Sequence, residues 1–205
     1  NTALKMTKHK QIHLIDYSSF CATDYLLFFK NIAHEITHSY HIEINVGTLE
    51  ENRTGEFNGK VINIDIDQTE EEKLILHLHL FGHIVQWSVS PYYRELGLKQ
   101  PGFTEFESYR QELLKQIEEI YTYEEEASAY GLQLLHHCGI HELDQWLSDW
   151  FHADWKFLKR VYENGFRKEF TENFKAQYFI KNSPMILAKE IPVFVSEEWE
   201  YRFAF

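Results

Sequence analysis

The chain has 205 residues, 44% of them hydrophobic and 16% aromatic, so it can bury the core of one globular domain. Its 32 acidic residues outnumber 20 lysines and arginines, and the net charge of −12 argues against nucleic acid as a partner, because an acidic surface repels phosphate. No apolar run approaches the roughly 20 residues that a membrane-spanning helix needs, so no membrane partner is predicted.

Two cysteines, Cys21 and Cys138, are present, and they belong to no CxxC motif. Such sparse cysteine usage predicts no disulfide framework. Together with the lack of a recognisable secretory leader, it indicates a reducing, cytoplasmic compartment. The sequence leaves the oligomeric state open.

The first part of the chain predicts a helix between two short strands. A weakly patterned arm contains one expected strand at 12–15. Asp24 is a residue type that caps helix N-termini, and a buried stripe at helical spacing follows it, which predicts a helix over 24–40. A short strand is expected at 42–46. Residues 47–60 are polar with three glycines and predict a loop or hairpin.

The next segment has the clearest local signals in the chain. Isoleucine alternates with polar residues over 61–66, which predicts a half-buried strand. Thr69 and Glu72 then have the spacing of a capping box, in which each side chain accepts a hydrogen bond from the other residue's backbone N–H. We therefore expect a helix over 70–88.

The second half of the chain is predicted to be mainly helical. A long helical zone spans 104–137, broken near Tyr121 or Gly131, and a further helix spans 141–163. The chain closes on a predicted terminal strand or hairpin with aromatic residues at every second position: Trp199, Tyr201, Phe203 and Phe205.

Histidine is abundant, with 12 residues, and it offers several possible metal sites. Two histidines four apart lie on one face of a helix and can share a metal ion. Chance alone gives about one such pair at this composition, so spacing is weak evidence. The chain has four pairs: His9/His13, His34/His38, His79/His83 and His137/His141.

The pair His34/His38 belongs to a complete HExxH motif, with Glu35 at the position that polarises the attacking water in zinc proteases. On pattern alone this is the strongest match. Its context is poor, because no convincing strand precedes it and no later glutamate is clearly matched to it. It stays open as an alternative metal site.

The pair His79/His83 has the better context. A strand leads through a capped turn into its helix, and Gly82 allows close packing against a neighbouring helix. An acidic run at 124–126, on a later predicted helix, can supply a third ligand. The alternative interpretation is two ordinary histidines on an amphipathic helix.

The run Val61–Asp65, the cap Thr69–Glu72 and the motif Leu78–Val85 together resemble the ImmA/IrrE family of metallopeptidases. The resemblance covers about residues 24–137. It implies an α+β, zincin-like fold, in which a small sheet packs on an active-site helix and a partner helix. It also implies a zinc ion bound by His79 and His83.

The family's third ligand lies on a helix that reads roughly E-x-E-A-N-x-F-A. The matching stretch here is Glu124–Gly131, so the resemblance makes Glu124 the third ligand, or Glu125 or Glu126 in a shifted register. Residues 1–138 would then form the metal-binding domain. Residues 139–205, which the resemblance does not reach, would form a C-terminal extension of helix and strand packed on it.

The sequence departs from the family at Leu80, which replaces the catalytic glutamate. A metal ion held by three protein ligands still has an open position where it can activate water. Peptide hydrolysis also needs a group that takes up a proton and returns it. We consider three replacements: Glu35 as a base, if the first helix packs over the site; Gln86 to orient water; and Tyr123 to polarise a carbonyl.

Three functions follow from these observations. The first is a zinc-dependent hydrolase, peptidase-like, with a protein or peptide substrate and an unconventional base. The second is a catalytically inactive pseudo-peptidase that acts as a regulatory or interaction protein. The third is a non-hydrolytic metalloenzyme, since two histidines and one carboxylate also suit iron.

Overall fold

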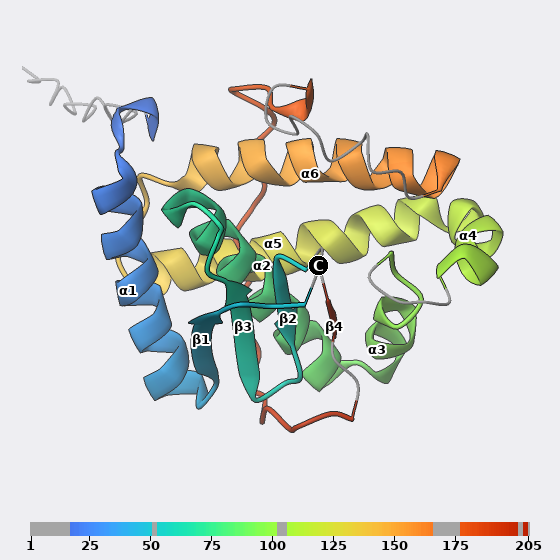
Figure 1. The fold of residues 1–205 in the computed structure, drawn as a ribbon, viewed down its shortest axis with the longest axis horizontal. Coiled ribbons are helices and arrows are strands. Elements are labelled where there is room, and N and C mark those ends of the chain that lie inside the picture. The colour runs from blue at the N-terminus through green and yellow to red at the C-terminus, as the bar shows by residue number, and fades with distance from the viewer. Residues whose placement is uncertain (1–16, 51–52, 102–105, 166–176, 201–202, 205) are drawn as a thin grey trace, which may run out of the picture.

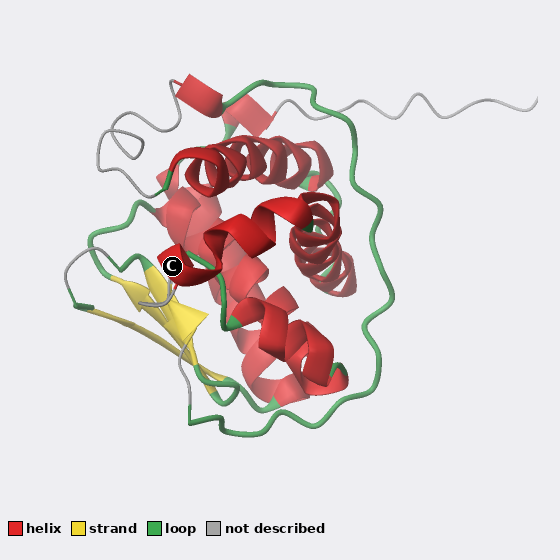
Figure 2. Cartoon of the chain, turned by 90° about the vertical axis from the view of Figure 1, so that its right-hand side faces the viewer, coloured by secondary structure: helices red, strands yellow, loops and turns green. Residues whose placement is uncertain are grey.

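Figure 1 shows the computed structural model, which describes residues 17–50, 53–101, 106–165, 177–200 and 203–204. The chain is α+β, and its sheet packs on one side of a group of helices (Figure 2). The described helices are η1 (Tyr17–Ser19), α1 (Ala22–Tyr40), α2 (Glu70–Val89), α3 (Pro91–Gly97), α4 (Phe106–Lys115), α5 (Ile117–His137) and α6 (Asp144–Asn164). The strands are β1 (Glu43–Gly47), β2 (Gly55–Phe57), β3 (Val61–Asp65) and β4 (Phe203–Ala204).

The sheet is small and mixed, with strand order β1-β3-β2-β4. β1 pairs in parallel with β3, whereas β2 pairs antiparallel with both β3 and β4. Ile62 and Ile64 are fully buried, as the alternating pattern predicts. Ile66 is 52% exposed, because β3 ends at Asp65. The Asp65 carboxylate accepts hydrogen bonds from Asp67 N in the turn that follows and from Leu49 N in the segment after β1.

Helix α2 runs through the centre of the molecule, between the sheet and the other helices (Figures 1 and 2). The predicted capping box begins it: Thr69 Oγ1 accepts from Glu72 N at 3.2 Å, and Glu72 Oε2 accepts from Thr69 N at 2.9 Å. Every residue from His77 to Trp87 is buried. The predicted helix over 70–88 is therefore confirmed, and its middle turns contact protein on all sides.

Two glycines let α2 and α5 approach closely. A Cβ atom at Gly82 would lie 2.0 Å from the carbonyl oxygen of Ala127, a distance that no side chain can adopt. A Cβ atom at Gly131 would lie 3.0 Å from the carbonyl oxygen of Leu78. The close packing predicted for Gly82 is thus confirmed, and Gly131 lies inside α5.

Three sequence predictions about element boundaries were wrong. Asp24 does not cap α1: Cys21 is the N-cap, and Asp24 Oδ2 accepts from Cys21 N at 2.8 Å from the third helical position. The break in the helical zone falls at Gln116 rather than at Tyr121 or Gly131, which both lie within α5. Helix α6 begins at Asp144 instead of 141.

The C-terminal part of the chain packs on the rest through α6. The indole nitrogens of Trp146 and Trp150 both donate to Glu71 Oε1, at 3.0 and 3.1 Å, which joins α6 to the first turn of α2. Residues 179–200 then pass around the outside of the helices without helix or strand and lead back to the sheet (Figure 2). The predicted terminal strand is confirmed only at β4, where Phe203 pairs with Phe57, and Trp199 lies outside it.

Two further expectations concern cysteines and membranes. Cys21 and Cys138 are both free thiols in the structure. Among the helices of the described ranges, none has the length and apolar character needed to cross a bilayer. The strand expected at 12–15 lies outside the described residues.

Candidate metal centre

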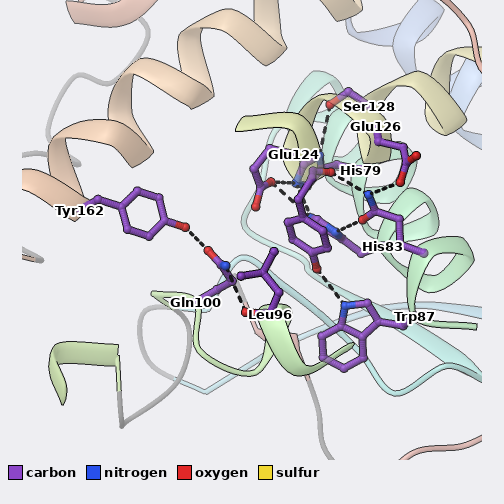
Figure 3. Close-up of polar contacts among 11 residues, drawn as sticks. His79, His83, Trp87, Leu96, Gln100, Glu124, Glu126, Ser128 and Tyr162 are labelled. Atoms are coloured by element: carbon purple, nitrogen blue, oxygen red, sulfur yellow. Dashed lines mark hydrogen bonds and ion pairs between the residues drawn. The ribbon is translucent and has the colours of Figure 1, made fainter. Parts of the chain in front are cut away.

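Three potential ligand atoms meet where α2 and α5 cross. His79 Nε2 lies 3.0 Å from His83 Nε2 and 3.2 Å from Glu124 Oε2, and His83 Nε2 lies 3.4 Å from the same Glu124 oxygen. All three side chains are buried. Figure 3 shows the two rings and the carboxylate pointing toward one another. The sequence predicted these three residues, and Glu124 is the acidic residue that the structure brings to the histidines.

The spacing of the three atoms suits a small divalent cation. Tetrahedral coordination with bond lengths near 2.0–2.2 Å separates ligand atoms by about 3.3–3.6 Å. The observed separations of 3.0–3.4 Å fall within a few tenths of an ångström of that range. Small side-chain adjustments therefore suffice to hold such an ion.

Gln86 fixes which nitrogen of His83 is free. The Gln86 amide nitrogen donates to Tyr123 O at 2.7 Å and to Glu126 Oε2 at 3.0 Å, so its oxygen must face His83 Nδ1 at 2.9 Å. An oxygen there accepts a proton from Nδ1, which leaves Nε2 with a lone pair directed at His79 and Glu124. The Gln86 interaction thus prepares His83 as a ligand.

Without a cation, this arrangement brings acceptor atoms together. Glu124 Oε2 is a buried atom that faces His79 Nε2 at 3.2 Å and His83 Nε2 at 3.4 Å. Burial on its own raises the pKa of Glu124, but His83 and His79 outweigh it and lower that pKa to about 2. The carboxylate is therefore ionised at neutral pH, and a buried negative charge requires a positive partner.

The other predicted participants lie around the centre in different ways. Gln86 is fully buried beside His83, as described above. The Tyr123 ring packs on His83 with centroids 4.7 Å apart, and its hydroxyl accepts from Trp87 Nε1 at 2.8 Å. Tyr123 thus has contacts that position His83. Glu35 lies half-buried on α1, where its charge acts on Tyr40 and Cys138, and no described contact joins it to the three ligands.

The alternative pair His34/His38 lies on the exposed side of α1, with its rings stacked 3.8 Å apart. Among the described residues, two groups have the ligand spacing of a metal site: His79/His83/Glu124 and a partly exposed group of His136, His141 and Asp144. In the second group His136 Nε2 lies 2.8 Å from Asp144 Oδ1, an ordinary ion pair at a helix end. Neither group includes His34 or His38.

The neighbours of Glu124 have other partners. Glu125 Oε1 accepts from the Tyr121 hydroxyl at 2.8 Å. Glu126 accepts from Gln86 and from Lys189, so it supports the site without entering it. Glu125 and Glu126, the alternative third ligands of the sequence analysis, therefore do not join the two histidines.

Leu80, at the position where an HExxH motif has glutamate, is fully buried against the sheet. A Cβ atom at Gly55 of β2 would lie 2.9 Å from Leu80 Cδ1. Leu80 thus fills the space that the absent side chain of Gly55 leaves. This contact is apolar and offers no proton acceptor.

Sequence reasoning missed a carboxylate, Asp154 of α6. It shares the lining of a cavity of about 60 Å³ with His79 and Ser128. Burial raises the pKa of Asp154 to about 6, with His79 opposing this shift and Glu124 adding to it. One signal was available: Asp154 follows Trp150 by four residues, so an acidic residue shares a helical face with a large aromatic one.

Comparison with known proteins gives no match: no family model, curated protein or solved structure is significantly similar to this chain. The resemblance to ImmA/IrrE peptidases therefore stays a prediction, and the function has to be argued from the site itself.

Proposed function

We propose that His79, His83 and Glu124 bind one divalent metal ion, zinc before iron, in a zincin-like α+β fold. The observation that carries this proposal is the convergence of three acceptor atoms at 3.0–3.4 Å, with the proton of His83 held on the opposite ring nitrogen by Gln86. A hydrogen bond to the Glu124 oxygen requires a proton on one of the two imidazole Nε2 atoms, whereas a cation satisfies all three atoms at once.

We further propose that the protein is a metal-dependent hydrolase of the peptidase-like kind. A zinc ion with three protein ligands keeps a position open, where it activates water and polarises a carbonyl group. The protein's part is to orient the ligands and exclude bulk water. His83 is fully buried and Glu124 is 3% exposed, whereas His79 lines the small cavity, so reactants approach from the His79 side.

One observation favours a second candidate, a metal-holding protein without catalysis. Leu80 is buried against β2, so the position that usually supplies the base contributes only packing. In that case the ion would stabilise the α2–α5 crossing, and the protein would act as a regulatory or interaction module.

Elemental analysis of the purified protein tests the metal site. We expect about one zinc or iron per chain in the native protein and in His34→Ala, and a loss of bound metal in His79→Ala. His34 is a matched control because it belongs to the competing histidine pair. A native protein that lacks metal and refuses added zinc would contradict both candidate functions, and loss of metal only in His34→Ala would move the site to α1.

Hydrolysis by the zinc-loaded protein separates the two candidates. A mixture of short fluorogenic peptides is the probe, with His79→Ala as the blank. Cleavage that depends on His79 supports the hydrolase, and full metal occupancy without cleavage supports the metal-holding protein.

A further inference from the structure

Two cavities share Asp154 in their lining, and the inner one also contacts His79 of the candidate metal centre. The inner cavity, about 60 Å³, has His79, Ser128 and Asp154 as its polar lining residues. The outer cavity, about 220 Å³, also contacts Asp154 and ends at polar residues such as Gln68 and Glu72. A space of 60 Å³ holds at least one water molecule, so Asp154 lies where solvent reaches the ligands.

The distance of Asp154 from the centre suits a role through water. Three ligand atoms of the site lie within 4.8 Å of one another, and Asp154 is not a member of that group. Its charge nevertheless acts on His79 and Glu124 across the cavity. A carboxylate that lines the same cavity as a ligand, without joining the ligand group, has the placement of a general base that acts through water rather than of a fourth ligand.

Asp154 differs from the structural carboxylate on the same helix. Asp149 Oδ2 accepts from the Tyr17 hydroxyl at 2.6 Å, and its carboxylate also accepts from Ser183 N at 2.7 Å and Asn182 N at 3.1 Å. Within the described part of the chain, no hydrogen bond or ion pair joins Asp154 to another side chain. The fold thus uses Asp149 to join segments and leaves Asp154 facing the cavity.

The remaining inner lining is apolar, from Ile75, Leu76, Trp150 and Phe151. Such walls exclude bulk water and strengthen the electrostatic effect of one carboxylate on a reactant. Leu76 lies one helical turn before Leu80 on α2. Leu80 packs against β2, whereas Asp154 reaches the cavity beside His79 from α6.

We propose that Asp154 is the catalytic base of this site and replaces the glutamate missing at position 80. This inference rests on the proposed hydrolase function. In the step it implies, an oxygen of water bonds to the carbonyl carbon of the substrate while one proton moves to an Asp154 carboxylate oxygen. The C–N bond then breaks, Asp154 returns that proton to the leaving nitrogen, and its carboxylate is regenerated.

Asp154→Asn tests this role, because it removes the charge and keeps the shape. The control is Glu163→Gln, the same loss of one negative charge at an exposed position of α6. We expect both variants to bind zinc in the native ratio. Cleavage of the fluorogenic peptides should fall by at least about 100-fold in kcat for Asp154→Asn, with KM nearly unchanged, and stay at the native rate for Glu163→Gln.

A binding measurement supplies a readout that does not depend on turnover. The visible spectrum of the cobalt-substituted protein reports azide binding at pH 7.5. Removing a carboxylate that faces the open side of the centre should strengthen azide binding about tenfold in Asp154→Asn, and Glu163→Gln should match the native protein. Native kcat and azide affinity in Asp154→Asn would overturn the role of Asp154 and leave the metal site intact.

Failure of the proposed function gives a different pattern. If the native protein binds neither zinc nor cobalt, the metal site and the role of Asp154 fall together. If it binds both metals but cleaves no peptide, the hydrolase and the base fall, while the azide result still shows which face of the centre is open.

Discussion

The α2–α5 pair and helix α6 contribute to one site in opposite ways. The pair supplies side chains whose partners are fixed: His83 by Gln86, and the helix crossing by Gly82 against Ala127. Helix α6 supplies Asp154, whose position depends on how the whole helix packs on the pair. The difference shows that a rigid crossing can hold the ligands while a later element determines what reaches them.

The two carboxylates of the site also have opposite electrostatic environments. For Glu124, His83 and His79 overcome the effect of burial and lower the pKa to about 2. For Asp154, burial dominates and raises the pKa to about 6. A permanently ionised carboxylate suits a metal ligand, whereas one that titrates near neutrality suits proton transfer.

The largest expected effect concerns the ligand on α5. Glu124→Gln keeps the shape of the side chain but removes its charge, so zinc affinity should fall by more than about 100-fold, beyond the loss usual for an outer hydrogen-bond partner. Competition with a chromophoric chelator measures it. Glu125→Gln, one residue on, is the control and should keep native affinity. The opposite result would shift the register of α5 and break the assignment of the ligands.

The next effect tests the crossing that holds the ligands. Gly82→Val places a side chain against the Ala127 backbone, where a Cβ atom would meet oxygen at 2.0 Å. The free energy of unfolding should fall by about 3 kcal/mol, because backbone cannot move aside cheaply. Gly47→Ala is the control, since nothing lies within 4 Å of a Cβ atom there. Equal urea midpoints for the two variants would contradict a tight crossing.

A smaller loss is expected at the residue that orients His83. Gln86→Leu removes the acceptor for His83 Nδ1 but leaves all three ligands, so zinc affinity should fall about 10- to 100-fold with the stoichiometry unchanged. Gln133→Leu, on the exposed part of α5, should bind zinc as the native protein does. Native affinity in Gln86→Leu would show that the crossing alone orients the ring.

The smallest expected effect is on the pH dependence of stability, and it comes from Asp154 of α6. The folded pKa of Asp154, about 6, exceeds its ordinary 3.8, so the folded state holds the proton more tightly than the unfolded state. Stability from this group is present at low pH and is lost as pH rises from about 4 through about 6. Asp154→Asn lacks this loss.

Metal-free Asp154→Asn should therefore be more stable than the native protein at pH 7 by about 1 kcal/mol, a value reduced from the full shift because the side chain is partly exposed. The gain should shrink toward pH 4. Urea unfolding at both pH values measures it. A variant that is less stable at pH 7 would mean that the Asp154 charge is favourable in the fold.

Features that depend on residues close together in the sequence could be predicted, whereas contacts between distant segments could not. The strand predicted over 61–66, the Thr69 cap and the pair His79/His83 are local patterns. The structure confirms the cap and the closeness of the two histidines, and it confirms the strand up to Asp65. The predicted N-cap at Asp24 was wrong, because α1 begins earlier and Cys21 is its N-cap. Asp154 was out of reach, because it lies more than 70 residues after His79 and only the packing of α6 brings the two residues to one cavity.

Leu80 and Gly55 together make a glutamate at position 80 hard to accommodate. A glutamate there would place a carboxylate in a fully buried site against β2, at a cost of about 3 kcal/mol or more while it lacks a partner. Gly55 in turn has little room for a polar side chain as long as Leu80 is present. Either residue therefore restricts the other, and a glutamate at position 80 requires two coordinated changes rather than one.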